Sequence, residues 1–149
     1  IPFEKVWTSP LQRASRTCAL AGFGDSADID SDLVEWDYGD YEGLRSPEIR
    51  AKNPDWKLFR DGAPGGESVE QVAARADRVA ARLRTITGTA LVFSSGHFLR
   101  ALATRWIGLP LSPQCLSFLL STASVSALGY EYADRPVVRL WNDTLHLQG

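Results

Sequence analysis

The chain has 149 residues, a formal net charge of −2, and 44% hydrophobic and 23% charged residues. These values are typical of a globular protein, so we expect residues 1–149 to form a single domain with a sizeable core. The basic residues are scattered, which argues against a nucleic-acid partner, and no apolar stretch is long enough to span a membrane. No signal-peptide pattern is present either, so we expect a cytoplasmic protein without a membrane partner.

The two cysteines, Cys18 and Cys115, are too few and too far apart to predict a disulfide framework or a zinc site. We expect two reduced, buried thiols. The sequence contains no methionine and starts at Ile1, a bulky residue before which an initiator methionine is normally retained. We therefore expect native sequence to precede Ile1.

The first predicted elements are a strand over Val6–Ser9 and a helix that runs to about Leu20. Ser9 and Gln12 have the spacing of a capping box, with a proline at the first helical position between them. Arg13 then lies at the positive end of the helix dipole, where a cation is unfavourable unless an anion binds beside it. A solvent-exposed side chain is the alternative.

The next part of the chain has few regular signals. Residues 28–35 alternate weakly and predict an extended segment, and residues 36–43 are too rich in glycine and aspartate for a regular element. Short helices are expected over 46–52 and around Trp56, followed by a glycine-rich loop over 62–66.

The longest predicted helix runs from Ser68 to about Ile86, and Ser68 and Gln71 form a second capping box. One apolar face follows it at helical spacing: Val69, Val72, Ala73, Ala76, Val79, Ala80, Leu83 and Ile86. A buried strand over 89–94 and a helix over 98–107 come next.

Two final strands are expected over 124–132 and 137–141, joined by a turn at 133–136. Strands that alternate with helices predict an α/β layered fold with a mainly parallel sheet and an antiparallel edge.

His97 is the first candidate for chemistry, because it lies where a predicted strand ends and a helix begins. Open α/β sheets bind ligands at such points, and the backbone N–H groups there attract anions. A packed or capping histidine is the alternative. The other histidine, His146, lies near the C-terminus without a partner motif, and we expect it to be structural.

Arg13, Glu35 and His97 together suggest phosphoryl chemistry. Arg13 offers a fork of donors to an oxyanion, and Glu35 lies where a strand end can present a carboxyl group to a cleft. Such groups stabilise charge and protonate a leaving oxygen. The sequence has no GxGxxG, Walker A or GxSxG motif and no cluster of metal ligands, so we expect no cofactor and no metal.

Five segments of the chain, in order, resemble the histidine phosphatase family, also called the phosphoglycerate-mutase-like superfamily. They are Thr8–Ala14 with Thr17, Glu35 with Gly39–Gly43, Gly65–Ser68, Ser95–His97 with Leu99–Leu102, and Ala123–Ser126. The resemblance implies a three-layer αβα sandwich, and it covers nearly the whole chain.

The resemblance also implies roles for individual residues. Arg13 matches the arginine that binds the transferred phosphoryl group, and Glu35 matches the carboxyl group that protonates the leaving oxygen. His97 matches the second histidine, which contacts the phosphoryl oxygens, and the backbone of Phe98 would hold the same oxygens. Tyr38 would line the substrate pocket.

Other side chains receive weaker assignments. Trp36 and Tyr41 are further candidates for the pocket wall, although core packing explains each of the three aromatic residues equally well. Glu67 is expected to organise the start of its helix rather than to perform chemistry.

The family's nucleophile, a histidine in an Arg-His-Gly motif that ends the first strand, does not occur in this sequence. The predicted Val6–Ser9 strand matches the family's second strand, so the first strand and helix are missing. We therefore expect the nucleophile upstream of Ile1 and an inactive 1–149 segment.

The implied function is a metal-independent phosphatase that acts through a phosphohistidine on a small phosphorylated metabolite. Segments Glu35–Gly43 and Trp56–Gly62 look closer to the sugar-bisphosphatase branch, which contains sedoheptulose-1,7-bisphosphatase, than to the true mutases, and this favours a sugar phosphate. A phosphoglycerate mutase and a non-catalytic phosphate-binding module are the alternatives. A homodimer is compatible with the sequence.

Overall fold

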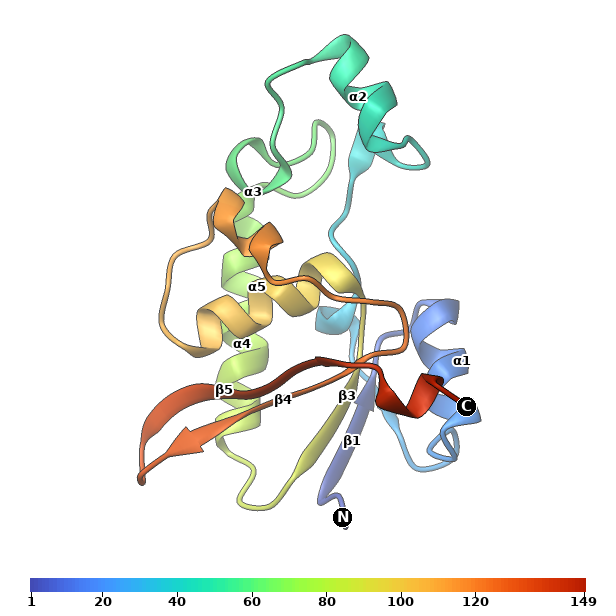
Figure 1. The fold of residues 1–149 in the computed structure, drawn as a ribbon, viewed down its shortest axis with the longest axis vertical. Coiled ribbons are helices and arrows are strands. Elements are labelled where there is room, and N and C mark those ends of the chain that lie inside the picture. The colour runs from blue at the N-terminus through green and yellow to red at the C-terminus, as the bar shows by residue number, and fades with distance from the viewer.

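The computed structural model describes all residues 1–149, and its centre is a parallel sheet of three strands (Figure 1). The strands are β1 (Lys5–Thr8), β2 (Asp28–Ile29) and β3 (Ala90–Phe93), in the order β2-β1-β3. β3 pairs only with β1, so its other edge has no strand partner. The sequence predicted β3 to be buried, but all four of its residues are only half-buried, because a strand with one partner is covered less completely.

Helices cover both faces of this sheet, which gives the expected three layers. α1 (Gln12–Leu20) contacts β1 and β3 from one side, and α4 (Val69–Arg84) and α5 (Gly96–Trp106) pack against each other on the opposite side (Figure 1). α2 (Ser46–Lys52) and α3 (Leu58–Asp61) lie beyond one end of the sheet, in the region of the expected short helices. The α/β class is therefore confirmed.

The longest helix begins as its sequence predicts. The Ser68 hydroxyl accepts a hydrogen bond from the Gln71 backbone at 3.1 Å, and the Gln71 side chain accepts one from Ser68 N at 2.8 Å. Reciprocal pairing of this kind satisfies two helix donors that have no partner within the helix. The helix ends at Arg84, two residues before the predicted end.

The predicted capping box of α1 is wrong. Leu11 is the residue before the helix, and Ser9 accepts a hydrogen bond from Leu11 N at 3.2 Å instead of from a helical amide. Ser9 is still tied to the sheet, because its own amide donates to Phe93 O at 2.9 Å. The helix therefore begins only after the chain has left the sheet beyond β1. In contrast, α5 begins earlier than the predicted residue 98: it starts at Gly96 and includes His97 in its first turn.

Most of the predicted extended segment 28–35 is not a strand. Only Asp28–Ile29 pairs with β1, and Ser31–Leu33 forms a single turn of 3-10 helix. The Asp30 carboxylate accepts a hydrogen bond from Asp32 N at 2.9 Å and thereby initiates this turn. Further 3-10 turns lie at Gly39–Tyr41, Pro113–Ser117 and Leu145–Leu147.

The predicted antiparallel edge is a separate ribbon of two strands, β4 (Val125–Glu131) and β5 (Arg135–Asp143). It is anchored to α5 rather than to β3: Trp106 Nε1 donates to Gly129 O at 3.1 Å, and the Trp106 and Tyr130 rings are 5.2 Å apart. β5 begins inside the predicted turn, because a proline at position 136 is tolerated on an edge strand.

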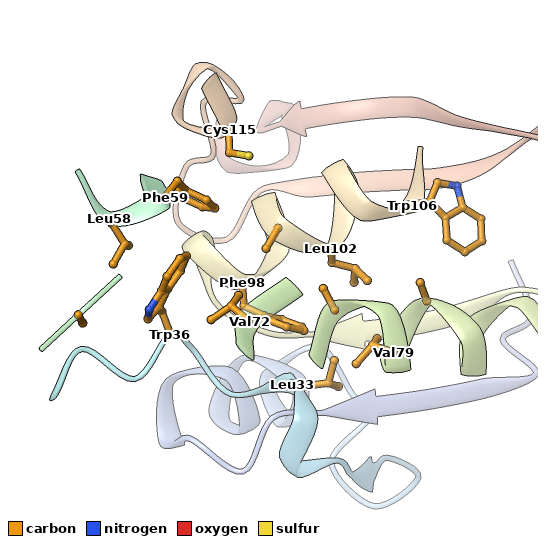
Figure 2. Packing of buried hydrophobic residues seen from close by; sticks show 14 residues of the cluster. Leu33, Trp36, Leu58, Phe59, Val72, Val79, Phe98, Leu102, Trp106 and Cys115 are labelled. Atoms are coloured by element: carbon orange, nitrogen blue, oxygen red, sulfur yellow. The ribbon is translucent and has the colours of Figure 1, made fainter. Parts of the chain in front are cut away.

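The main core lies between α4, α5 and the segments that cross their ends. Figure 2 shows the buried side chains of this cluster. They are Leu33, Trp36, Leu58, Phe59, Ala63, Val72, Ala76, Val79, Ala80, Phe98, Ala101, Leu102, Trp106 and Cys115. Small residues at the α4–α5 contact allow the two helices to approach closely. Cys18 and Cys115 are buried and unpaired, as the sequence predicted. None of the helices combines the length and apolar character that crossing a bilayer requires.

Candidate active site

Three loops meet at the C-terminal edge of the parallel sheet. Thr8 pairs with Phe93, so the segments that follow β1 and β3 leave the sheet side by side and enter α1 and α5. The Ser94 hydroxyl donates to Leu33 O at 2.6 Å and ties the segment that precedes Glu35 to the same place. This edge of an α/β sheet is the usual location of a ligand site.

The Glu35 carboxylate caps the N-terminus of α5. Its Oε1 accepts hydrogen bonds from Phe98 N at 2.8 Å and Trp36 N at 2.9 Å, and its Oε2 accepts one from His97 N at 3.1 Å. Because the first N–H groups of a helix have no partner within it, an anion is favoured here. The structure thus brings Glu35 and His97 together as the sequence suggested.

The His97 ring lies between two aromatic side chains and contacts one of them by a hydrogen bond. The Tyr38 hydroxyl is 2.5 Å from His97 Nδ1, and Phe59 packs edge-on against the imidazole with 6.0 Å between ring centroids. Burial lowers the pKa of His97 more than the nearby Glu35 carboxylate raises it, and Arg100 adds to the lowering. The imidazole is therefore neutral at pH 7.

Arg13 approaches this group from α1. Its side chain is exposed, no acidic residue accompanies it in the first helical turn, and its carbonyl accepts the Thr17 hydroxyl at 2.9 Å. The pKa of Tyr38 is raised by burial and by the charge of Glu35, and the positive charge of Arg13 opposes this rise. The guanidinium therefore lies within electrostatic range of Tyr38 and has no ion-pair partner that an incoming anion would have to displace.

In the structure the Glu35 carboxylate already occupies the backbone N–H of Phe98 that was predicted to bind phosphoryl oxygens. Because this N–H donates to Glu35, a phosphoryl oxygen would have to share or replace that contact. The Phe98 ring is fully buried in the core. Binding of phosphoryl oxygens by the Phe98 amide stays a prediction.

Arg75 is a site-organising residue that the sequence reasoning missed. It is only 5% exposed, and its guanidinium binds both carboxylate oxygens of Glu67, at 2.7 and 3.0 Å. The same guanidinium donates to the carbonyl oxygens of Asp32 at 2.8 Å and Val34 at 2.6 Å, and it lies 4.3 Å above the Phe98 ring. One buried cation thus joins α4, α5 and the loop that carries Glu35.

A sequence signal for Arg75 did exist. The residue lies between Val72, Ala76 and Val79 on the apolar face of α4, where an arginine is out of place unless it has partners. Glu67 has the organising role expected of it, since its Oε1 also accepts a hydrogen bond from Asp37 N at 2.9 Å.

Two glycines allow the loops that carry Glu35 and Glu67 to cross. A Cβ on Gly39 would lie 2.2 Å from Gly66 N, and one on Gly66 would lie 2.2 Å from Asp37 O. Gly39 also has a φ of 51°, which favours glycine. The crossing is closed by the hydrogen bond from Asp40 N to Pro64 O at 2.7 Å.

Of the three aromatic candidates for the pocket wall, only Tyr38 contacts the site. Trp36 is buried in the core next to Phe59 (Figure 2), and its Nε1 donates to Glu67 O at 3.0 Å. Tyr41 packs edge-on against Trp56, with 5.2 Å between the ring centroids.

The remaining candidates lie outside the site. His146 Nε2 is 2.9 Å from Ala123 O, a contact between the C-terminal turn and the start of the ribbon that fits a structural role. No group of three or more His, Cys, Asp or Glu side chains is arranged to hold a metal ion.

Comparison with known proteins relates the whole arrangement to one family. The profile of the Histidine phosphatase superfamily (branch 1) matches residues 1–144. An acid phosphatase of Mycobacterium tuberculosis is 43% identical over 137 residues, which are 91% of this chain and 66% of that protein. Sedoheptulose 1,7-bisphosphatase of Saccharomyces cerevisiae is 33% identical over 135 residues, and the match covers 74% of this chain and 50% of that protein.

Solved structures agree with this relationship. The structure of an open reading frame product from Mycobacterium tuberculosis superimposes with a TM-score of 0.86 and 39% identity, over 93% of this chain and 71% of that chain. A mycobacterial glucosyl-3-phosphoglycerate phosphatase, solved with inorganic phosphate, superimposes with a TM-score of 0.77 and 25% identity, over 95% of this chain and 77% of that chain. The chain spans between half and two thirds of the length of the two curated relatives.

Proposed function

Because the chain belongs to the histidine phosphatase superfamily, we propose that the protein hydrolyses a small phosphate monoester through a phosphohistidine. The observation that carries this proposal is the contact of Glu35 with the first turn of α5, beside His97. This carboxyl group and imidazole lie at the end of the sheet where α1 begins, and Arg13 in the first turn of α1 has no ion-pair partner. Together with a nucleophile, groups of these types can stabilise charge and protonate a leaving oxygen in phosphoryl transfer.

The chemistry assigns one step to each group. In the first half-reaction the nucleophilic histidine attacks phosphorus, the bond from phosphorus to the substrate oxygen breaks, and the Glu35 carboxylic acid protonates that oxygen. In the second, the Glu35 carboxylate takes a proton from water, the water oxygen attacks phosphorus, and the phosphorus–nitrogen bond breaks. Arg13 and His97 hold the non-bridging oxygens throughout.

The nucleophile is assigned to sequence that precedes Ile1. Two observations support this assignment. First, the unpaired edge of β3 offers backbone donors and acceptors for a further parallel strand, whose C-terminal end would lie beside Glu35 and His97. Second, the relatives are longer than this chain. We expect residues 1–149 alone to give no turnover.

A sugar phosphate is the proposed class of substrate. The relatives named above include a sugar bisphosphatase and a phosphatase of a glucosylated phosphoglycerate. In this chain the segment 44–62, which contains α2 and α3, lies beyond the end of the sheet at which Glu35 is presented (Figure 1). It is the part of the described fold in position to cover a substrate.

The proposal is tested with the complete protein, including the sequence upstream of Ile1. Sugar phosphates should release inorganic phosphate, excess chelator should leave the rate unchanged, and rapid denaturation at alkaline pH, where the phosphorus–nitrogen bond is stable, should trap a phosphorylated histidine. Isomerised phosphoglycerate formed without phosphate release would identify a mutase instead. Phosphate binding without turnover would identify a binding module.

Arg13→Ala in the complete protein provides the corresponding test of the site. A guanidinium that neutralises charge in the transition state contributes about 3 kcal/mol, so kcat should fall about a hundredfold. Arg16→Ala is the matched control, since Arg16 is an exposed arginine on the same helix. Normal turnover of Arg13→Ala would remove this residue from the site.

A further inference from the structure

The hydrogen bond between Tyr38 and His97 joins residues that are 59 positions apart in the sequence. Tyr38 is held by its neighbours: Asp37 N donates to Glu67, and Gly39 N donates to the Asp37 side chain at 2.9 Å. The Gly39 and Gly66 backbones approach so closely that neither position has room for a Cβ. The segment that carries the phenol is therefore held by hydrogen bonds and by close backbone packing.

The protonation of the two groups allows the phenol to be the donor. Burial raises the pKa of the Tyr38 phenol, and the Glu35 carboxylate raises it further. The phenol therefore keeps its proton at neutral pH and can donate it to Nδ1, which lies 2.5 Å away. A neutral imidazole whose Nδ1 accepts must carry its own proton on Nε2.

Nε2 is free to meet a ligand. No protein group is hydrogen-bonded to it, and the structure contains no buried side-chain nitrogen or oxygen without a partner, so Nε2 is open to solvent. Phe59 packs on the ring and restricts its rotation. A proton at Nε2 is a donor that a phosphoryl oxygen would accept, whereas a lone pair there would repel it.

We propose that Tyr38 is a positioning residue that fixes His97 as the neutral tautomer with its proton on Nε2, so that Nε2 donates to a phosphoryl oxygen of the substrate. The inference rests on the proposed function and refines the sequence-based expectation for Tyr38. Tyr38 acts through His97 and need not touch the substrate itself.

The other charged groups around the pair do not fix this tautomer. Glu35 is hydrogen-bonded to the backbone amide of His97 and not to its ring, and Arg100 donates its Nε proton to Phe118 O at 2.7 Å. Arg13 and Glu42 act on the phenol only through their charges. Among the hydrogen bonds of the structure, only the one from Tyr38 reaches the His97 ring.

The test uses the complete protein with 15N-labelled histidine. His97 resonances are identified as those that disappear in His97→Gln. The wild-type spectrum should show His97 protonated at Nε2 and unprotonated at Nδ1. In Tyr38→Phe the tautomers should mix and the pKa of His97 should rise, because the neutral imidazole loses the donor that stabilised it.

Turnover supplies the second readout. Tyr38→Phe should lower kcat about tenfold, as expected for the loss of one neutral hydrogen bond, with KM changed less than about twofold. Tyr130→Phe is the matched control, because Tyr130 packs against Trp106 on the ribbon, away from His97. This control should leave both the tautomer and kcat unchanged.

Three results would overturn the inference: a proton on Nδ1 of wild-type His97, an unchanged tautomer in Tyr38→Phe, or unchanged kcat in spite of a changed tautomer. The first is measured on wild-type protein and does not depend on how well the variant folds. Failure of the proposed function looks different, since a complete protein without phosphatase activity can still show the Nε2 proton in its spectrum.

Discussion

The region around α4 and α5 and the β4–β5 ribbon differ in how completely they are packed. α4 and α5 contribute most of the buried core, and Arg75 joins them to the loop that carries Glu35. In contrast, no residue of β3, β4 or β5 is buried. The ribbon also borders an open hollow of about 520 Å³, lined by Tyr130, Glu131, Tyr132, Val137, Val138 and Arg139.

This contrast shows that the described site depends on only one of the two regions. The groups proposed to act on the leaving oxygen and the phosphoryl oxygens are positioned by α1, α5 and the loops beside α4. The ribbon contributes support through its contact with Trp106. Variants in the first region should therefore have large effects, and variants in the ribbon small ones.

Arg75→Ala should have the largest effect on stability. Removal of the guanidinium leaves the Glu67 carboxylate and two backbone carbonyls without their partner, at a cost of about 4 kcal/mol in the free energy of unfolding. Arg78→Ala is the control one helical turn away, where the exposed ion pair with Asp32 is screened by solvent and its loss should cost far less. Denaturant unfolding of the complete protein measures both. Equal losses would show that the buried contacts of Arg75 contribute no more to stability than the exposed ion pair of Arg78.

Glu35→Gln should have the next largest effect, and this effect should be on the rate of turnover. Hydrolysis of alkyl phosphates should slow about a hundredfold, because a poor leaving group needs the proton that Glu35 donates. Nitrophenyl phosphate, whose leaving group departs as an anion, should be affected far less. Steady-state rates on the two substrates test this, and equal losses on both would make Glu35 a helix cap without a role in proton transfer.

Ala123→Gly tests the ribbon side of the comparison. Ala123 has a φ of 59°, a left-handed conformation that glycine adopts more readily. The substitution should stabilise the protein by about 0.5–1 kcal/mol in a thermal melt. The neighbouring Ser124→Gly is the control, since Ser124 does not have a positive φ, and it should not be stabilising. Destabilisation by Ala123→Gly would mean that the conformation carries no strain.

The pH dependence of stability should show the smallest effect, because one proton is involved. The pKa of His97 is lowered in the folded protein, so the unfolded chain binds a proton first as the pH falls below about 6.5. The free energy of unfolding should therefore decrease from that pH downward, and less steeply in His97→Gln. A wild-type curve identical to that of His97→Gln would contradict the lowered pKa.

The structural features that were predicted correctly depend on residues that are close together in the sequence. The capping box of α4 and its apolar face are local patterns, and both are present in the structure. Glu35 and His97 were expected in one site, and the Glu35 carboxylate binds the backbone amide of His97, although the segment before Glu35 contains a 3-10 turn and is not fully extended as expected. The start of α1 was not predicted correctly, because Ser9 is held by a backbone bond to Phe93, which is 84 residues away.

The contacts that the sequence did not predict are long-range side-chain contacts. The Tyr38–His97 bond and the Arg75 contacts with the Glu35 loop join residues about 40 to 60 positions apart. Tyrosine near a glycine turn and arginine on a helix are common patterns, and neither pattern identifies its partner. The separate ribbon was missed for a similar reason, since strand periodicity does not specify which edge a strand will pair with.

The cap that Glu35 forms on α5 has a consequence for local unfolding. The amide hydrogens of His97 and Phe98 can exchange with solvent only after the carboxylate leaves the helix. That carboxylate belongs to a loop whose carbonyl groups are bound to Arg75 in the middle of α4. We therefore expect the site to open as one cooperative unit and the exchange rates of these two amides to measure how often it does so.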